Sequence, residues 1–110
     1  MRLKGTDELS KVNTIKIGYK TYRIEKPLEI KEISAEYYGI ASHENATITI
    51  ADKLEQHDKN HVFIHELLHA ICARFQMREL NEEEQTLDLL ASGIYEAIID
   101  NPHIFLMEDI

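Results

Sequence analysis

The residues with the clearest chemical potential are two histidines and a glutamate in the run His65-Glu66-Leu67-Leu68-His69. On a helix, His65 and His69 would lie on one face, about 40° and ~6 Å of rise apart. Two imidazoles at that spacing can bind one metal ion, and zinc suits such ligands at bond lengths of about 2.1 Å. Glu66 would lie beside the ion, where it could take a proton from a zinc-bound water and return it to a leaving group. The run therefore predicts a Zn²⁺ site with Glu66 as its general base.

A catalytic zinc ion also needs a third protein ligand and an open position for water. We predict Glu84 as this ligand, because it shares a helix face with Asp88 that can turn toward the first helix. Asp88 could then accept a hydrogen bond from a ligand imidazole and fix its tautomer. Alternatives stay open: Glu84 could be a capping-box residue that follows Asn81. In a straight antiparallel helix pair, Asp88 would come closer than Glu84 to the level of His69 and could be the third ligand instead. Glu83 is the next candidate after Asp88.

Other polar residues near the motif are weaker candidates for metal binding or catalysis. Cys72 could reach the same face, but a lone helical cysteine is usually a small buried apolar residue. His57 and His61 continue the spacing of four residues backwards and are predicted to be exposed on the first turns. His61 is about 12 Å of rise from the second motif histidine, too far to share one ion with both. His43, in a loop, and Tyr95, on the second helix, could stabilise an oxyanion.

Two helices must position these side chains. Residues 57–76 predict a helix, because apolar residues recur at its 3.6-residue period: Ile64, Leu67, Leu68, Ile71 and Phe75. A second helix is predicted after an N-cap at Asn81, with an acidic first turn, and it ends at Asp100-Asn101-Pro102. Its apolar stripe consists of Leu87, Leu90, Ala91, Ile94 and Ile98.

Short strands precede the helices. Residues 14–24 predict a hairpin or two short strands with Gly18 as a turn or bulge, and residues 28–33 a third extended piece or a short helix. Residues 37–42 and 46–51 flank a plausible hairpin loop. Strands followed by helices indicate an α+β fold in which two packed helices cover a small antiparallel sheet. Residues 1–13 lack a clear period and are predicted to be a flexible arm before a single domain of residues 14–110.

Composition limits the classes of function. The 110 residues suit one domain, with 44% hydrophobic and 29% charged residues. No apolar run approaches a membrane span, the first residues lack a signal peptide, and a single cysteine excludes an intrachain disulfide, so we expect a cytoplasmic protein. Net charge is −8, and no Lys or Arg follows Arg78, which argues against nucleic acid as the main partner. Eight of the twelve basic residues lie within residues 1–31, a spread typical of a solvated sheet.

The motif and its spacing resemble a known group of enzymes. His65-Glu-Leu-Leu-His69 followed by Glu84-x-x-x-Asp88 is similar to the gluzincin pattern, in which a glutamate on the next helix is the third ligand and an aspartate orients a histidine. Residues 48–102, about half of the chain, resemble small phage and prophage proteins related to ImmA/IrrE-like metallopeptidases. The resembling segments are Ala46–Ala51, His65–Ile71, Glu84–Ala91 and Gly93–Pro102.

The resemblance implies a minimal zincin-like metallopeptidase domain: a zinc-dependent hydrolase that acts on a protein or peptide. The small core and the expected sheet edge are compatible with a monomer or weak dimer. It also implies that the strand of residues 46–51 lies at the edge of the active-site cleft, where a peptide could pair with it. The alternative is a catalytically silent zinc-binding regulatory or protein-interaction module of phage origin, with the acidic C-terminal half as its contact surface. A purely structural zinc site is less favoured, because such sites usually have four protein ligands and more than one cysteine.

Overall fold

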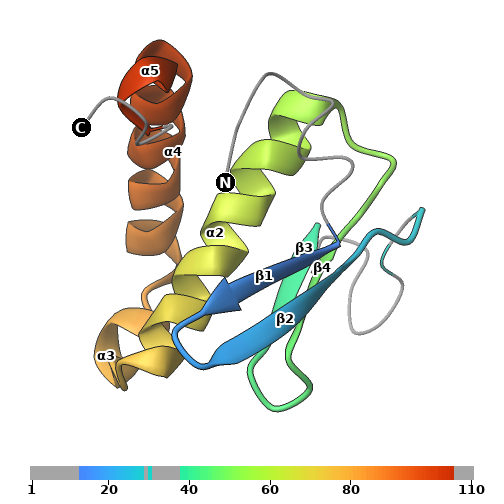
Figure 1. The fold of residues 1–110 in the computed structure, drawn as a ribbon, viewed down its shortest axis with the longest axis vertical. Coiled ribbons are helices and arrows are strands. Elements are labelled where there is room, and N and C mark those ends of the chain that lie inside the picture. Colours follow the sequence, from blue (N-terminus) through green and yellow to red (C-terminus); the bar gives the residue numbers. More distant parts are fainter. Residues whose placement is uncertain (1–12, 29, 31–37, 106–110) are drawn as a thin grey trace.

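The computed structural model describes residues 13–28, 30 and 38–105. The arm predicted for residues 1–13 and the piece predicted for residues 28–33 lie almost wholly outside this part of the chain. Four strands precede four helices along the described chain (Figure 1): β1 (Thr14–Ile17), β2 (Lys20–Glu25), β3 (Gly39–Ser42), β4 (Thr47–Ile50), α2 (Gln56–Arg74), α3 (Arg78–Asn81), α4 (Glu84–Asp100) and α5 (Pro102–Phe105). The predicted α+β class is confirmed.

The four strands form one sheet in the order β1-β2-β4-β3. Both predicted hairpins are present as antiparallel pairs, and Gly18 makes the first turn at φ 64°, a backbone conformation that favours glycine. However, β2 and β4 pair in parallel, with Ile24 opposite Ile48. The sheet is therefore mixed, and the prediction of a purely antiparallel sheet is wrong at its centre.

The parallel pairing also corrects the expected edge strand. Residues 46–51 were expected at the edge of the cleft, but β4 lies between β2 and β3. Its apolar side chains explain this interior position, since Ile48 and Ile50 are 0% and 2% exposed, and strands with neighbours on both sides are the most buried. The edge strand of this hairpin is β3, whose residues are all only partly buried.

Helix α2 lies across one face of the sheet and contacts β1, β3, β4, α3 and α4 (Figure 1). Its bounds agree within two residues with the predicted helix of residues 57–76. Phe63 and Ile64 of α2 pack on Tyr22, Ile48 and other side chains of the sheet in one apolar cluster. This packing leaves a second face of α2 turned toward α4.

The connection between the two long helices differs from the prediction. Asn81 is not an N-cap but the last residue of the short helix α3, and α4 begins at Glu84 with Glu83 as its N-cap and no side-chain capping bond. The carboxamide of Asn81 is instead bonded to His69. A tertiary contact has thus replaced the local cap that the sequence pattern favoured.

Helix α4 packs on α2 with only part of its predicted apolar stripe. Leu87 and Ala91 are fully buried, whereas Leu90 and Ile94 are 45% and 37% exposed. In the described part of the chain, α4 is in contact with the other helices and not with the sheet, so its outer face stays open (Figure 1). Among the described residues, none of the helices combines the length and the apolar character needed to cross a bilayer.

Candidate metal centre

The two motif histidines and Glu84 converge between α2 and α4. Nε2 of His65 lies 3.1 Å from Glu84 Oε2, and Nε2 of His69 lies 2.7 Å from Glu84 Oε1. The possible ligand atoms of these three residues all lie within 4.8 Å of one another, so this group could hold a metal ion. Of the three acidic candidates for the third ligand, the structure brings Glu84 into the group. Glu83 is the N-cap residue of α4, and Asp88 lies one turn further along.

The antiparallel arrangement of the helices explains the meeting of these residues. Glu84, at the start of α4, contacts the histidines in the second half of α2, whereas Tyr95, further along α4, contacts His57 near the start of α2. The histidines repeat every four residues, as the side chains of one helix face do. The side of α2 that packs on the sheet is mainly apolar, with Glu66 buried next to β3, whereas His65 and His69 are presented to α4.

A side-chain oxygen lies near the other nitrogen of each motif histidine, but only His69 is hydrogen-bonded to it. Nδ1 of His69 donates a hydrogen bond of 2.6 Å to Asn81 Oδ1. Nδ1 of His65 is buried without a hydrogen bond, and the oxygen that faces it is Asp88 Oδ1, at 3.3 Å. The Asn81 contact holds the imidazole of His69 with Nε2 directed at the centre, and Asp88 lies on the corresponding side of His65. This arrangement is compatible with a divalent metal ion bound through both Nε2 atoms.

Glu66 lies beside this centre with its side chain largely buried. It is 8% exposed, and its Oε2 atom is 4.0 Å from Nε2 of His65. Burial raises the pKa of its carboxyl group, the two motif histidines act in the opposite direction, and the charge of Glu84 raises the pKa further. A backbone hydrogen bond from Ala41 on β3 favours the ionised form. A carboxylate with a raised pKa is a stronger base and is suited to take and return a proton.

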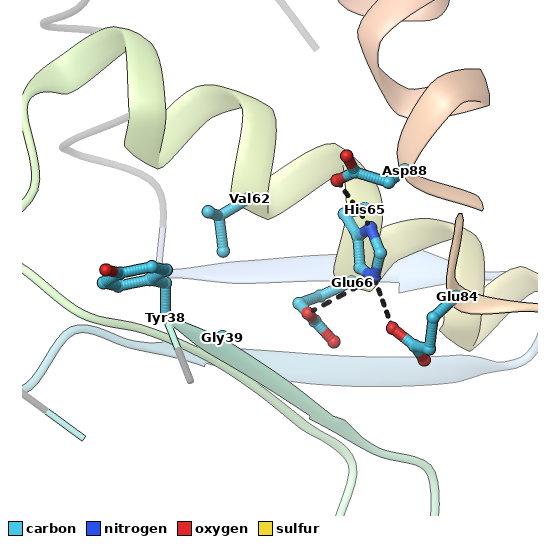
Figure 2. A pocket seen from close by; sticks show the side chains of 7 residues that line it. All are labelled: Tyr38, Gly39, Val62, His65, Glu66, Glu84 and Asp88. Atoms are coloured by element: carbon cyan, nitrogen blue, oxygen red, sulfur yellow. Dashed lines mark hydrogen bonds and ion pairs between the residues drawn. The ribbon is translucent and has the colours of Figure 1, made fainter. Parts of the chain in front are cut away.

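A pocket of about 170 Å³ opens next to the centre. It is lined by Tyr38, Gly39, Val62, His65, Glu66, Glu84 and Asp88. Figure 2 shows Tyr38 and Val62 at one end and the carboxylates around His65 at the other. The pocket therefore joins an apolar wall beside β3 to the polar metal centre, and its volume suits water or one small side chain.

Gly39 permits the close approach of β3 and α2 at this pocket. A Cβ atom there would lie 2.5 Å from Val62 Cγ1 and 2.9 Å from Glu66 Cγ. Contacts this short are sterically forbidden, so the absence of a side chain at Gly39 allows the edge strand to pack on α2 next to Glu66.

The weaker candidates have other surroundings. Cys72 is buried, burial raises the pKa of its thiol, and it is not part of the cluster of possible ligands found among the described residues. His43 is bonded through Nδ1 to the hydroxyl group of Tyr22, at 2.6 Å. The hydroxyl group of Tyr95 is bonded to His57 and does not line the pocket. The structure therefore does not bring the two proposed oxyanion stabilisers to the centre.

Sequence reasoning missed the polar contacts that α4 makes along the other histidines of α2. His57 is exposed, as predicted, but its Nδ1 atom lies 2.6 Å from the hydroxyl group of Tyr95. His61 is only 30% exposed and lies against Ser92 and Asp88, so the prediction of an exposed His61 is wrong. Once Glu84 is set opposite the motif, Asp88 and Ser92, four and eight residues further along α4, reach His61. Tyr95, a further three residues along, reaches His57. The sequence indicated Asn81 only as an N-cap and not as a partner of His69.

Comparison with known proteins finds no match to any family model, curated protein or solved structure. The resemblance to small phage metallopeptidases, and with it the zincin-like identity of the fold, therefore stays a prediction from the sequence. The cluster of His65, His69 and Glu84 stands on the geometry of this chain alone.

Proposed function

We propose that this protein is a zinc-dependent hydrolase, and more specifically a peptidase. The observation that supports this is the convergence of three ligand atoms on one point, with Glu66 beside them and a pocket open to the same point. Two imidazoles and one carboxylate are a common ligand set of catalytic zinc, which leaves a fourth position for solvent. Zinc, when bound, supplies Lewis acidity that polarises a carbonyl group and activates water.

The residues of the chain have separate roles in this proposal. His65, His69 and Glu84 hold the ion, while Asp88 and Asn81 keep the imidazoles oriented. Glu66 takes a proton from the attacking water and delivers it to the leaving nitrogen.

An extended peptide is the substrate that the surroundings favour. Strand β3 borders the pocket through Gly39, next to Tyr38, and lies at the edge of the sheet that the described residues form, where an extended chain could pair with it. The apolar wall formed by Tyr38 and Val62 could receive a side chain of that peptide. Hydrolysis of a peptide bond is therefore preferred here over hydrolysis of a small soluble ester or amide.

A comparison of two glutamine variants tests the peptidase proposal. The zinc-loaded protein and its Glu66→Gln variant are incubated with a broad peptide pool, and new termini are counted by mass spectrometry. We expect Glu66→Gln to retain zinc and to lose cleavage by about 10²-fold or more. The matched control is Glu96→Gln, which changes an exposed glutamate of α4 and should cleave like the wild type. Zinc binding without cleavage that depends on Glu66 would refute the peptidase proposal.

A protein-interaction module is the second candidate, and the exposed apolar side chains of α4 are the observation that favours it. Leu89, Leu90, Ile94 and Ile99 are between 37% and 66% exposed, and exposed apolar surface can mark a contact site. No Lys or Arg follows Arg78, so a basic partner with apolar side chains would be complementary to this helix. This candidate predicts bound zinc and no turnover, which the same experiment detects.

A further inference from the structure

We propose that His61, Asp88 and Ser92 form a second, weaker site for a divalent cation, one helical turn from the first centre. The site would take ions that accept mixed nitrogen and oxygen ligands, such as Zn²⁺, Co²⁺ or Ni²⁺. It lies on the same face of α2 as the motif, because His61 precedes His65 by four residues. It shares none of the three predicted ligands of the first ion.

The proposal rests first on geometry. Nε2 of His61 lies 3.1 Å from Ser92 Oγ, 3.5 Å from Asp88 Oδ1 and 3.5 Å from the main-chain carbonyl oxygen of Asp88. The hydroxyl group of Ser92 also donates to that carbonyl oxygen at 3.1 Å. One nitrogen thus faces three oxygens from two adjacent turns of α4.

These separations match those around a bound ion. Ligands about 2.1 Å from a tetrahedral metal ion are about 3.4 Å from one another. The distances from His61 Nε2 to the three oxygens, 3.1–3.5 Å, fall around this value. Rotations of the His61, Asp88 and Ser92 side chains would direct their ligand atoms at a common centre, whereas the Asp88 carbonyl oxygen, which belongs to the backbone of α4, stays fixed.

The charge of the surroundings also favours a cation. Glu84 and Asp88 both lie on the side of α4 that faces α2, and no Lys or Arg follows Arg78. Helix α4 therefore brings no positive side chain that would compete for the oxygens. His61 is partly shielded, with 30% of its side chain exposed, which strengthens the interaction of a bound ion with its ligands.

Asp88 would couple the two sites. Its Oδ1 atom lies 3.5 Å from Nε2 of His61 and 3.3 Å from Nδ1 of His65. An ion at His61 would draw this carboxylate away from the imidazole that it orients, and the two cations would also repel each other. If the proposed hydrolase function holds, excess metal should therefore inhibit the enzyme. This consequence rests on that function, whereas binding of the second ion does not.

Zinc titration of the metal-free 110-residue protein tests the second site. Calorimetry should show two equivalents, the first tight and the second weaker, and equilibrium dialysis with metal analysis gives an independent count. We expect His61→Ala and Ser92→Ala each to weaken the second equivalent by about tenfold or more and to leave the first in place. Ser92→Ala puts a good helix former into α4, so this variant should fold even if the other does not.

The control is His103→Ala, which removes an exposed histidine of α5 and should retain both equivalents. A single equivalent in the wild type would overturn the proposal, as would a second equivalent that survives both His61→Ala and Ser92→Ala. Failure of the proposed function is detected separately. In that case His65→Ala would retain the first equivalent, or Glu66→Gln would cleave peptides like the wild type.

Discussion

Gly39→Ala offers a sharp test of how β3 supports the centre. The new methyl group would lie 2.5 Å from Val62 Cγ1 and 2.9 Å from Glu66 Cγ. Overpacking of this kind costs about 1–3 kcal/mol, which exceeds the ~0.5–1 kcal/mol that alanine gains over glycine in chain entropy. Because the strain acts on the side chain of the proposed base, we also expect any hydrolytic activity to fall. We expect Gly39→Ala to have a lower free energy of unfolding than the wild type and a Tm lower by several °C.

Chemical denaturation of three variants measures this effect. Gly93→Ala is the matched control, because a Cβ atom at Gly93 meets nothing within 4 Å and the residue lies inside α4. It should stabilise the protein by about 0.5–1 kcal/mol. Adding Val62→Ala to Gly39→Ala removes the closer clash and should recover part of the stability. Gly39→Ala that is as stable as the wild type would refute the close packing of β3 on α2.

Three further predictions follow from other side chains. In the metal-free protein, Glu66→Gln should raise the free energy of unfolding near pH 7, because burial raises the carboxyl pKa. The carboxyl group of Glu66 then binds a proton more tightly in the folded wild type than in the unfolded chain. The free energy of unfolding of the wild type therefore falls as pH rises through the raised pKa. The stability gained by Glu66→Gln should vanish below the ordinary pKa of 4.5. Urea melts at several pH values measure this difference, and a gain independent of pH would contradict it. Asn81→Ala should lower zinc affinity by about 10–100-fold in competition with a chelator, and Asn81→Asp, which keeps an acceptor for His69, should lose less. Equal affinities in all three proteins would mean that this contact does not orient the ligand. Leu87→Ala, at a fully buried position, should cost about 2–5 kcal/mol, whereas Leu89→Ala, at a side chain 66% exposed, should cost under about 0.5 kcal/mol; similar losses in thermal melts would argue against the packing of α4 on α2.

The sequence predicted the elements of this fold well because their patterns are local. The apolar period of α2 and the alternation in β4 each follow from a few neighbouring residues. The parallel pairing of β2 with β4 could not be predicted in this way. It depends on which strand of the first hairpin lies next to which strand of the second, and these strands are far apart in the sequence. The same limit led to the wrong edge strand, because hydrophobic alternation indicates a strand and not its place in the sheet.

In the candidate centre, too, local spacing could be read from the sequence, whereas contacts between elements could not. Two histidines and a glutamate within one helical turn could be identified from spacing, and Glu84 from a shared helix face. Asn81 could not, because its sequence signal was that of an N-cap, while its carboxamide is bonded to His69. The contacts of His61 depend on the alignment of α2 with α4, which a pattern within one helix does not contain.

X-ray absorption at the zinc edge, on protein loaded with one equivalent of zinc, tests the central claim most directly. The account predicts a shell of nitrogen and oxygen ligands at about 2.0–2.1 Å, with the scattering of two imidazoles and no sulfur. His69→Ala should lose one imidazole from that shell. A sulfur ligand at about 2.3 Å, which only Cys72 or a methionine could supply, or a spectrum without imidazole scattering, would contradict a centre built from His65, His69 and Glu84.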